Sequence, residues 1–255
     1  MSKEQIKSWR EYYAPLDKKF HKSKLSGKDL VRWKFQRYAK NYLRCVRGVD
    51  DSVGKIQDVL KELKLDKNTV VIYSSDQGFY IGDHGWYDKR WMYEESLKMP
   101  LIVKWPGVTE PGSRATQMVQ NLDYAETFLE MAGGKIPENM QGMSLVPILK
   151  NGRAESWRKS IYYHYYEFPS VHMIPRHYGI RTERYKLMHF YQFGNEWEMY
   201  DLQEDPDELQ NIYGKTGKEK LQEDMKKQLV AIRKYYDDNT DVAEKPADWK
   251  KKMRP

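Results

Sequence analysis

The stretch Thr69-Val70-Val71-Ile72-Tyr73-Ser74-Ser75-Asp76-Gln77-Gly78 places small and polar residues directly after a run rich in β-branched side chains. Continuous apolar runs of this length are typical of strands buried on both faces of an α/β sheet. Such sheets carry their chemistry in the crevice at the carboxyl ends of the strands. The stretch therefore predicts a buried strand over residues 69–74, with Asp76 and Gln77 emerging at its end.

Two helices are predicted before this strand. The sequence Ser2-Lys3-Glu4-Gln5 has the form of a capping box, so a helix should begin there and end near Pro15, followed by a polar loop. A longer helix is predicted from about Gly27 to Leu63, because apolar residues recur there every three or four positions. This apolar stripe is expected to be core, with Cys45 beside it as a buried, inert cysteine. The stripe consists of Phe35, Tyr38, Tyr42, Val46, Val49, Val53, Ile56, Leu60 and Leu63.

The second half of the chain has the pattern of a different architecture. Leu101–Lys104 predicts another buried strand, and Asn121–Met131 predicts a helix that stops at Gly133-Gly134. Beyond a Pro- and Gly-rich stretch over residues 135–157, short aromatic segments separated by turn residues predict an antiparallel sheet. The predicted strands are Ile161–Tyr166, Tyr178–Thr182, Tyr185–Tyr191 and Glu196–Leu202. A helix from about Lys218 to Tyr236 should follow, and the charged tail Asp237–Pro255 should wrap the surface.

These elements predict an α/β fold in two domains. Residues 1–150 would form an incomplete sheet flanked by helices. Residues 151–255 would form a smaller α+β domain with a four-stranded antiparallel sheet and one packed helix. Because the first sheet is incomplete, we expect an exposed edge that favours dimerisation or poor solubility.

The overall composition limits the classes of partner. The 255 residues carry 44 Lys and Arg against 37 Asp and Glu, a net charge of +7 that favours anionic partners such as sulfated sugars or phosphates. No helix-turn-helix, zinc-finger or aromatic RNA-binding motif is present, so nucleic acid is not an expected partner. A single cysteine excludes an internal disulfide, and no run is long enough for a membrane helix. No signal peptide begins at Met1.

Asp76 and Gln77 present a carboxylate next to an amide oxygen, which suits a hard cation such as Ca²⁺ or Mg²⁺. An Asp-x-Gly sequence after a strand is also a common turn. The dipeptide alone leaves both interpretations open.

The residues around Asp76 carry a family resemblance. Ser74-Ser75-Asp76-Gln77-Gly78, Gly82-x-His84-Gly85 and Lys89 closely resemble the second signature of the type I sulfatases, the formylglycine-dependent members of the alkaline phosphatase superfamily. The resemblance continues in family order over most of the chain. It is closest to bacterial N-acetylglucosamine-6-sulfatases and related glycosaminoglycan sulfatases. Its further segments are Trp91–Ser96, Pro100–Val103, Trp105–Gly107, His177–Thr182, Arg184–Leu187, Met199–Leu202 and Glu204–Glu208.

The resemblance implies an alkaline-phosphatase-like sheet and a set of site residues. Asp76 and Gln77 would be Ca²⁺ ligands, and Lys89 would hold the substrate sulfate and steady the leaving oxygen. His84, in the same loop, would position its neighbours; a histidine simply hydrogen-bonded within a turn is the alternative. Two residues of the C-terminal subdomain, His177 and Arg181, would contact the sugar. For Arg181, an ordinary surface salt bridge is the alternative interpretation.

The sequence also departs from the family. A sulfatase needs Cys-x-Pro-Ser/Ala-Arg, whose cysteine becomes the formylglycine nucleophile, but Cys45 lies in Cys-Val-Arg-Gly-Val. The family's N-terminal Asp-Asp pair and an earlier His-bearing segment are also missing. We therefore expect the C-terminal half of a sulfatase, inactive alone, with the formylglycine and the remaining Ca²⁺ ligands in the full-length family member. The expected partners are a missing N-terminal half or a second copy in a homodimer, and the full-length relative would be periplasmic or secreted.

Three functions remain open. The first is a sulfuric ester hydrolase acting on sulfated carbohydrate, such as glycosaminoglycan N-acetylglucosamine-6-sulfate. The second is a non-catalytic module that binds sulfated glycan through its basic, aromatic C-terminal sheet. The third is a phosphoesterase of the same superfamily. Such enzymes usually bind transition metals through His ligands, so Gln77 argues against this function.

Overall fold

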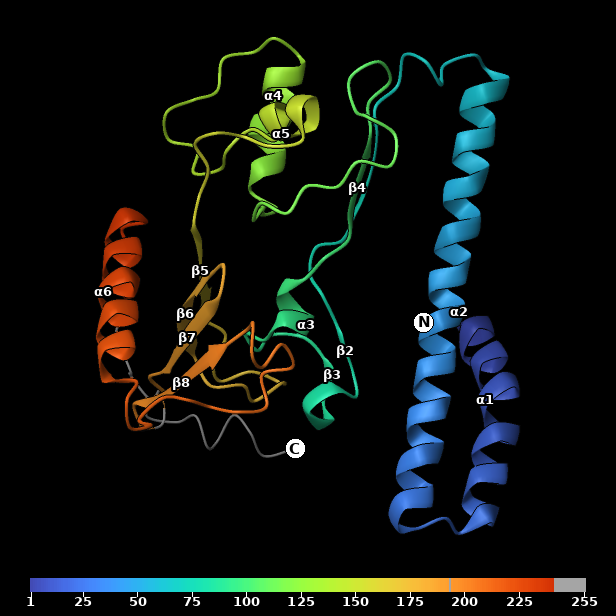
Figure 1. The fold of residues 1–255 in the computed structure, drawn as a ribbon. Helices are drawn as coiled ribbons and strands as arrows, with labels where there is room; N and C mark the ends of the chain where they lie inside the picture. Colours follow the sequence, from blue (N-terminus) through green and yellow to red (C-terminus); the bar gives the residue numbers. More distant parts are fainter. Residues whose placement is uncertain (193, 241–255) are drawn as a thin grey trace. The chain divides into compact units, whose positions relative to one another are not determined.

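The computed structural model describes residues 1–192 and 194–240, and these residues divide into two compact units. The first unit is Met1–Glu62, and the second begins at Leu63. Figure 1 shows both units, coloured from the N-terminus in blue to the C-terminus in red. The domain boundary expected near residue 150 stays a prediction. The tail that was expected to wrap the surface lies mostly beyond residue 240, outside the described residues.

The first unit is a helical hairpin. Its first helix, α1 (Lys3–Ser23), begins with the predicted capping box: Gln5 N donates to Ser2 Oγ at 3.2 Å, and Ser2 N donates to Gln5 Oε1 at 2.7 Å. The expected end near Pro15 is wrong, because α1 continues eight residues further, to Ser23. Pro15 removes one helical hydrogen bond, to the carbonyl of Glu11. Glu11 is exposed, which lets solvent satisfy that carbonyl.

The second helix, α2 (Gly27–Glu62), confirms the long helix that the apolar period predicts. The expectation that its stripe is core is wrong for this unit, since no residue of α1 or α2, both fully described, is buried. Val46 is 44% exposed and Ile56 57% exposed. Two helices alone have too little surface to enclose such a stripe. Cys45 is likewise exposed rather than buried.

The second unit begins with the strand predicted before the candidate site. This strand, β1 (Val71–Ser74), pairs antiparallel with β4 (Leu101–Lys104), from Val71 opposite Lys104 to Ser74 opposite Leu101. In the described residues this sheet has two strands. The expected burial of the second strand is wrong, because Ile102 is 64% exposed. An exposed edge agrees with the expectation of an incomplete sheet.

The chain between β1 and β4 forms four short elements: β2 (Tyr80–Ile81), the 3₁₀ turn η1 (Asp83–Gly85), β3 (Tyr87–Asp88) and α3 (Glu94–Leu97). Two helices lie between β4 and the next strand. They are α4 (Asp123–Met131), which confirms a predicted helix, and α5 (Val146–Asn151).

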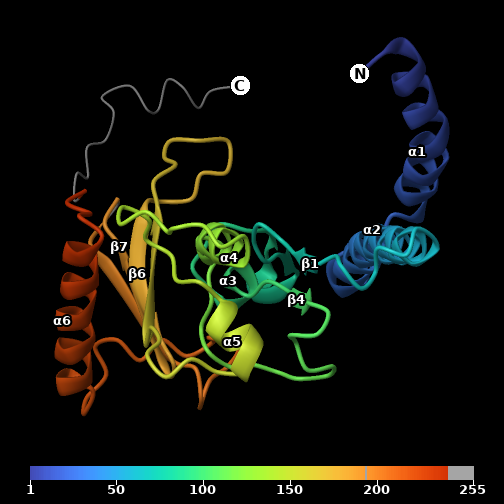
Figure 2. The same cartoon turned by 90° about the horizontal axis from the view of Figure 1, so that it is seen from above.

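A four-stranded antiparallel sheet in the order β5-β6-β7-β8 forms the centre of the second unit, as predicted. The predicted C-terminal helix, α6 (Glu219–Tyr235), covers one face of this sheet, while α3, α4 and α5 lie on the other side (Figure 2). The strands are β5 (Ser160–Tyr165), β6 (His177–Thr182), β7 (Tyr185–Phe190) and β8 (Glu196–Asp201).

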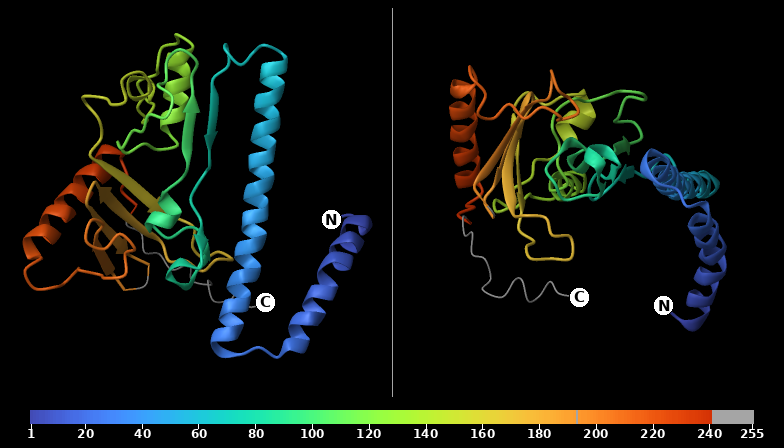
Figure 3. Two further views of the ribbon diagram at one scale, coloured as in Figure 1. Left: turned by 45° about the vertical axis from the view of Figure 1, so that its right-hand side comes forward. Right: turned by 90° about the horizontal axis from the view of Figure 1, so that it is seen from below.

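Side chains alternate between two cores across the sheet. Leu187 packs with Met225 of α6 in one cluster, whereas the next residue, Met188, packs with Tyr80 and Met92 in the other. This alternation is the period of two expected for a strand. Both faces of the sheet are therefore buried, and the second face fixes the segment from β2 to α3, which carries the candidate site (Figure 3). No helix in the described residues is long and apolar enough to cross a bilayer.

Candidate active site

Asp76 and Gln77 lie just beyond the end of β1, as predicted, after Ser75, and their backbone is held by neighbouring side chains. Ser75 Oγ donates to the Gln77 carbonyl at 2.9 Å, and Asn121 Nδ2 donates to the Asp76 carbonyl at 2.8 Å. The side chain of Asp76 is exposed, while Gln77 is half-buried. The turn thus uses the backbone of both residues and leaves their side chains available to a ligand.

Gly78 fastens this turn to α3. Its N–H donates to the Ser96 carbonyl at 2.8 Å. A Cβ at this position would lie 1.9 Å from the Glu95 carbonyl oxygen and 2.7 Å from that of Lys98. Only glycine allows such a close approach of two backbones. The glycine of the Asp-Gln-Gly motif is therefore required by packing.

Lys89 is presented by an unusual backbone. The residues on either side of it, Asp88 and Arg90, have φ angles of 90° and 106°, in the left-handed region that non-glycine residues rarely adopt. The Arg90 backbone is held at both ends: its N–H donates to Ser96 Oγ at 3.2 Å, and its carbonyl accepts from Tyr163 OH at 2.7 Å. Surrounding contacts of this kind are needed to hold a strained conformation.

The Lys89 side chain ends in a partly open environment. Its Nζ lies 3.4 Å from Asp88 Oδ1 and 5.9 Å from the centre of the Phe79 ring, and the side chain is 27% exposed. Phe79 is two residues after Gln77, so the Lys89 ammonium lies near the segment that follows the predicted cation ligands. Asp88 also accepts an ion pair from Arg90 and lies 3.5 Å from Nδ1 of His172.

His84 lies in an aromatic cluster rather than in the open. Its ring stacks on Tyr93, with centroids 4.6 Å apart, and its Nε2 lies 3.5 Å from Glu95 Oε2. The side chain is only 12% exposed. Its φ of 54° places it in the left-handed region. These contacts suit the predicted positioning role, because both the backbone and the ring are engaged.

His177 is completely buried, with no exposed surface. Its Nδ1 lies 2.8 Å from the Pro175 carbonyl, which can only accept, so Nδ1 carries the proton. Burial lowers the pKa of the imidazole to about 4, which makes it neutral at physiological pH. Its Nε2 has no hydrogen-bond partner among the described residues. The predicted contact with a sugar stays a prediction. The four rings around it are Trp91, Tyr163, Tyr165 and Phe190.

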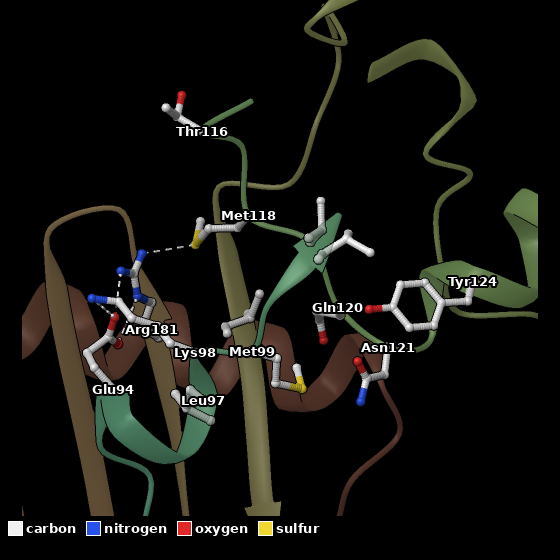
Figure 4. Close-up of a pocket in the computed structure, with 13 residues that line it drawn as sticks. Glu94, Leu97, Lys98, Met99, Thr116, Met118, Gln120, Asn121, Tyr124 and Arg181 are labelled. Carbon is white, nitrogen blue, oxygen red and sulfur yellow. Dashed lines mark hydrogen bonds and ion pairs between the residues drawn. The ribbon is translucent and has the colours of Figure 1, made fainter. Parts of the chain in front are cut away.

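Arg181 lines a pocket of about 230 Å³, shown in Figure 4. Its Nη2 lies 3.1 Å from Glu94 Oε2, and its side chain is 18% exposed. Asn121, whose amide binds the Asp76 backbone, lines the same pocket. The salt bridge that sequence reasoning left as an alternative for Arg181 is therefore present, but in a pocket wall rather than on an open surface.

A buried ionic network, which sequence reasoning missed, connects α3 to the sheet. Lys186 of β7 is completely buried, and its Nζ lies 2.9 Å from Glu94 Oε1 and 2.7 Å from Glu208 Oε1. Burial alone would raise the pKa of Glu94, but Lys186 and Arg181 outweigh it and lower this pKa to about 2. Burial dominates at Glu208 and raises its pKa. The network fixes the segment that holds Gly78 and Arg90.

The chemistry of the Asp76 and Gln77 side chains fits a hard cation, but the number of ligands is insufficient. Ca²⁺ takes six to eight oxygens. The described residues contain no cluster of three or more His, Cys, Asp or Glu side chains that could hold a metal ion. Asp76 and Gln77 could therefore supply only part of a calcium site. Cys45 does not fit a formylglycine, because it lies within helix α2 and lacks the required motif.

Comparisons with known proteins show that the chain is similar to sulfatases. A family model described as Sulfatase matches residues 6–134, and a model described as N-sulphoglucosamine sulphohydrolase, C-terminal, matches residues 82–235. An N-acetylglucosamine-6-O-sulfatase of Bacteroides thetaiotaomicron is 45% identical over 91% of this chain and 42% of its own length. A multifunctional alkaline phosphatase superfamily protein of Trinickia caryophylli is 28% identical over 87% of this chain and 45% of its own length.

A solved structure of a protein in complex with its substrate, D-glucosamine-2-N,6-O-disulfate, matches with a TM-score of 0.88 and 43% identity. That match covers 96% of this chain and 50% of the other. The chain thus spans less than half the length of the curated relatives named above.

Proposed function

Because this chain belongs to the sulfatase family, we propose that it supplies one part of the active site of a sulfuric ester hydrolase. The proposed substrate is a sulfated carbohydrate that contains 6-sulfated N-acetylglucosamine. This choice is supported by the relative that is named for that activity and by the structural relative with a bound sulfated glucosamine.

The observation that carries this proposal is the geometry of Lys89. The residues on either side of Lys89 have left-handed conformations, and its ammonium lies 5.9 Å from the ring of Phe79, two residues after Gln77, which supports a place for Lys89 in the same site. A compact cation there would bind a sulfate oxygen and stabilise the negative charge that develops on the ester oxygen as the bond breaks. Its nearest anion, Asp88, is shared with Arg90, which leaves Lys89 able to pair with a substrate.

Asp76 and Gln77 would hold Ca²⁺ together with oxygens from outside the described residues, and the cation would polarise the sulfate. His84 would position the loop through its contacts with Tyr93 and Glu95. Arg181 would contact the sugar from the pocket wall, and the predicted sugar contact of His177 belongs to the same proposal. The nucleophile is not among the 255 residues, so this chain contributes binding and charge stabilisation.

A chimera tests the proposal directly. The matching segment of the Bacteroides thetaiotaomicron relative would be replaced by this chain, and hydrolysis of N-acetylglucosamine-6-sulfate would be measured. Lys89→Ala in that chimera should lower turnover by about 10²–10³, the usual cost of removing one donor to a developing oxyanion. Lys104→Ala, at an exposed position of β4, is the matched control. Near-normal turnover with Lys89→Ala would refute the role of Lys89.

A phosphoesterase of the same superfamily is the second candidate, since one relative is named as a multifunctional superfamily protein. Metal analysis of the chimera separates the two candidates. Calcium supports the sulfatase, whereas a bound transition metal with faster cleavage of a phosphate ester than of the sulfate ester supports the alternative.

The cellular context of the whole protein follows from the same proposal. It would be exported, to the periplasm or the medium, where sulfated polysaccharide is met. A segment resembling the N-terminal half of the family would supply the missing groups, and a homodimer of this chain is a separate possibility. Peptide mapping of the native protein by mass spectrometry should show an additional segment with formylglycine, and light scattering should show whether two copies associate.

A further inference from the structure

The positive charge of this protein is concentrated in its helical hairpin. Residues 1–62 contain 16 of the 44 Lys and Arg residues but only 8 of the 37 Asp and Glu residues. The first unit therefore has a net charge of +8, and the rest of the chain has −1. From Lys18 to Arg47 there are 11 Lys and Arg residues and one acid, Asp29. The net charge of the chain is thus a local property of one structural unit.

Within α2, four of these cations lie on one side of the helix. Arg37, Lys40, Arg44 and Arg47 are separated by steps of three, four and three residues. Residues at such steps lie above one another on one face, so the four form a straight cation stripe about 15 Å long. At 100° per residue, this stripe points away from the apolar stripe of the same helix. A partner that covers the apolar stripe would therefore leave the cation stripe open.

Aromatic side chains lie at one end of the cation stripe. Trp33 of α2 stacks on Phe20 of α1, with centroids 4.2 Å apart, where α1 runs beside the first half of α2 (Figure 1). The Arg37 guanidinium lies 5.7 Å from the Trp33 ring and 5.8 Å from the Tyr13 ring. These contacts orient Arg37 without neutralising it.

Few anions compete for the other three cations. Lys40 and Arg44 are exposed, and Arg44 donates to Asn41, a neutral amide, at 3.0 Å. Arg47 lies 2.8 Å from Asp51 and 3.9 Å from Asp50, but all three side chains are exposed. Exposed pairs of this kind contribute little and exchange readily for another anion. The stripe is thus available to a ligand with several negative charges in a row.

We propose that the cation stripe of α2 binds a linear sulfated polysaccharide through residues other than those of the candidate active site. The choice of a sulfated glycan among polyanions rests on the proposed function, whereas the presence of a polyanion-binding surface rests on the hairpin alone. A straight row of cations on a helix matches a chain with repeated sulfates. The sequence has no motif that reads a nucleic-acid groove or stacks bases. Binding here would raise the local concentration of chain ends for the active site.

The test uses the whole chain and fluorescently labelled heparin as the probe, with affinity measured across a salt series. The test variant is Lys40→Gln/Arg44→Gln/Arg47→Gln. Its matched control, Lys215→Gln/Lys220→Gln/Lys234→Gln, removes the same charge from exposed positions of the second unit. The test variant should bind at least tenfold more weakly. Its salt slope should fall by about 2–3, roughly one for each cation lost, while the control stays within about twofold of the unmodified chain.

The outcomes separate this inference from the proposed function. Equal weakening in the test and control variants would overturn the stripe, since net charge alone would then explain binding. Duplex DNA binding as tightly as heparin at equal salt would overturn the choice of a glycan. Circular dichroism of the test variant checks that α2 is intact. The charge-conserving variant Lys40→Arg/Arg44→Lys/Arg47→Lys should bind heparin normally. If that variant lost binding, a charge-based surface would also be refuted. Turnover of the chimera with Lys89→Ala tests the sulfatase proposal by a separate measurement, so a failure there would leave the heparin result on the cation stripe intact.

Discussion

The change Lys186→Met, which removes the cation of the buried ionic network, should lower the stability of the protein. Lys186 is completely buried and pairs with two carboxylates, at 2.9 Å and 2.7 Å. After the change, Glu94 keeps Arg181 at 3.1 Å. Glu208 keeps only the Glu94 N–H at 2.7 Å and becomes a buried charge without a cation.

The expected loss is about 3–5 kcal/mol, the usual cost of removing one partner of a buried ion pair. For a unit of this size, the melting temperature should fall by roughly 6–20 °C. Urea titration followed by tryptophan fluorescence measures the free energy of unfolding. Lys104→Met, at an exposed position, should change it by less than about 0.5 kcal/mol.

The pH dependence of Lys186→Met identifies the cause. Burial already raises the pKa of Glu208, and removal of Lys186 raises it further. The folded variant then holds a proton that the unfolded chain releases above about pH 4.3, so its stability falls as the pH rises from 5 to 7. The loss relative to the unmodified chain should be smaller at pH 5 than at pH 7. Adding Glu208→Gln should restore part of the stability and remove this pH dependence. A loss below about 1 kcal/mol, or equal losses at both pH values, would refute the reasoning.

Two further predictions concern the candidate site. Gly78→Ala should destabilise the chain by about 3 kcal/mol or more in urea titration, because its Cβ would lie 1.9 Å from a backbone oxygen. Gly54→Ala, in an open helical position, should instead stabilise it by up to about 1 kcal/mol; equal effects would contradict the close contact. At His177, the folded pKa of about 4 lies below the unfolded value of about 6.5, so stability should fall by roughly 3 kcal/mol as the pH drops through this range. His177→Phe should abolish that loss in melting curves from pH 4 to 7, and an unchanged pH profile would show that other groups cause it.

Local patterns predicted most of the secondary structure. The apolar period of α2, the capping box at Ser2 and the aromatic strands β5–β8 were each confirmed, because they depend on residues close in sequence. The predicted family and fold class were also confirmed. The continuation of α1 past Pro15 was missed, since whether an exposed turn tolerates a proline depends on solvent access to one carbonyl.

Burial was the less reliable part of the prediction. The period of α2 shows that one face is apolar, but whether that face is covered depends on what packs against it. The same limit applies to β4, which was expected to be buried and whose Ile102 is exposed. The roles of His84, His177, Arg181 and the cation ligands stay predictions.

The sequence by itself determined the family, the order of elements and the loop from Asp76 to Lys89, because these are properties of neighbouring residues. Only the tertiary structure decided how that loop is held. Gly78 is fixed by carbonyls of the α3 segment, Arg90 by Tyr163, and α3 itself by Lys186 and Glu208. Glu94 and Glu208 are 114 positions apart and are joined by the Glu94 N–H and by Lys186, and a network over such a separation leaves no periodic signal in the sequence. It forms because the folded sheet brings these charges together where water is excluded.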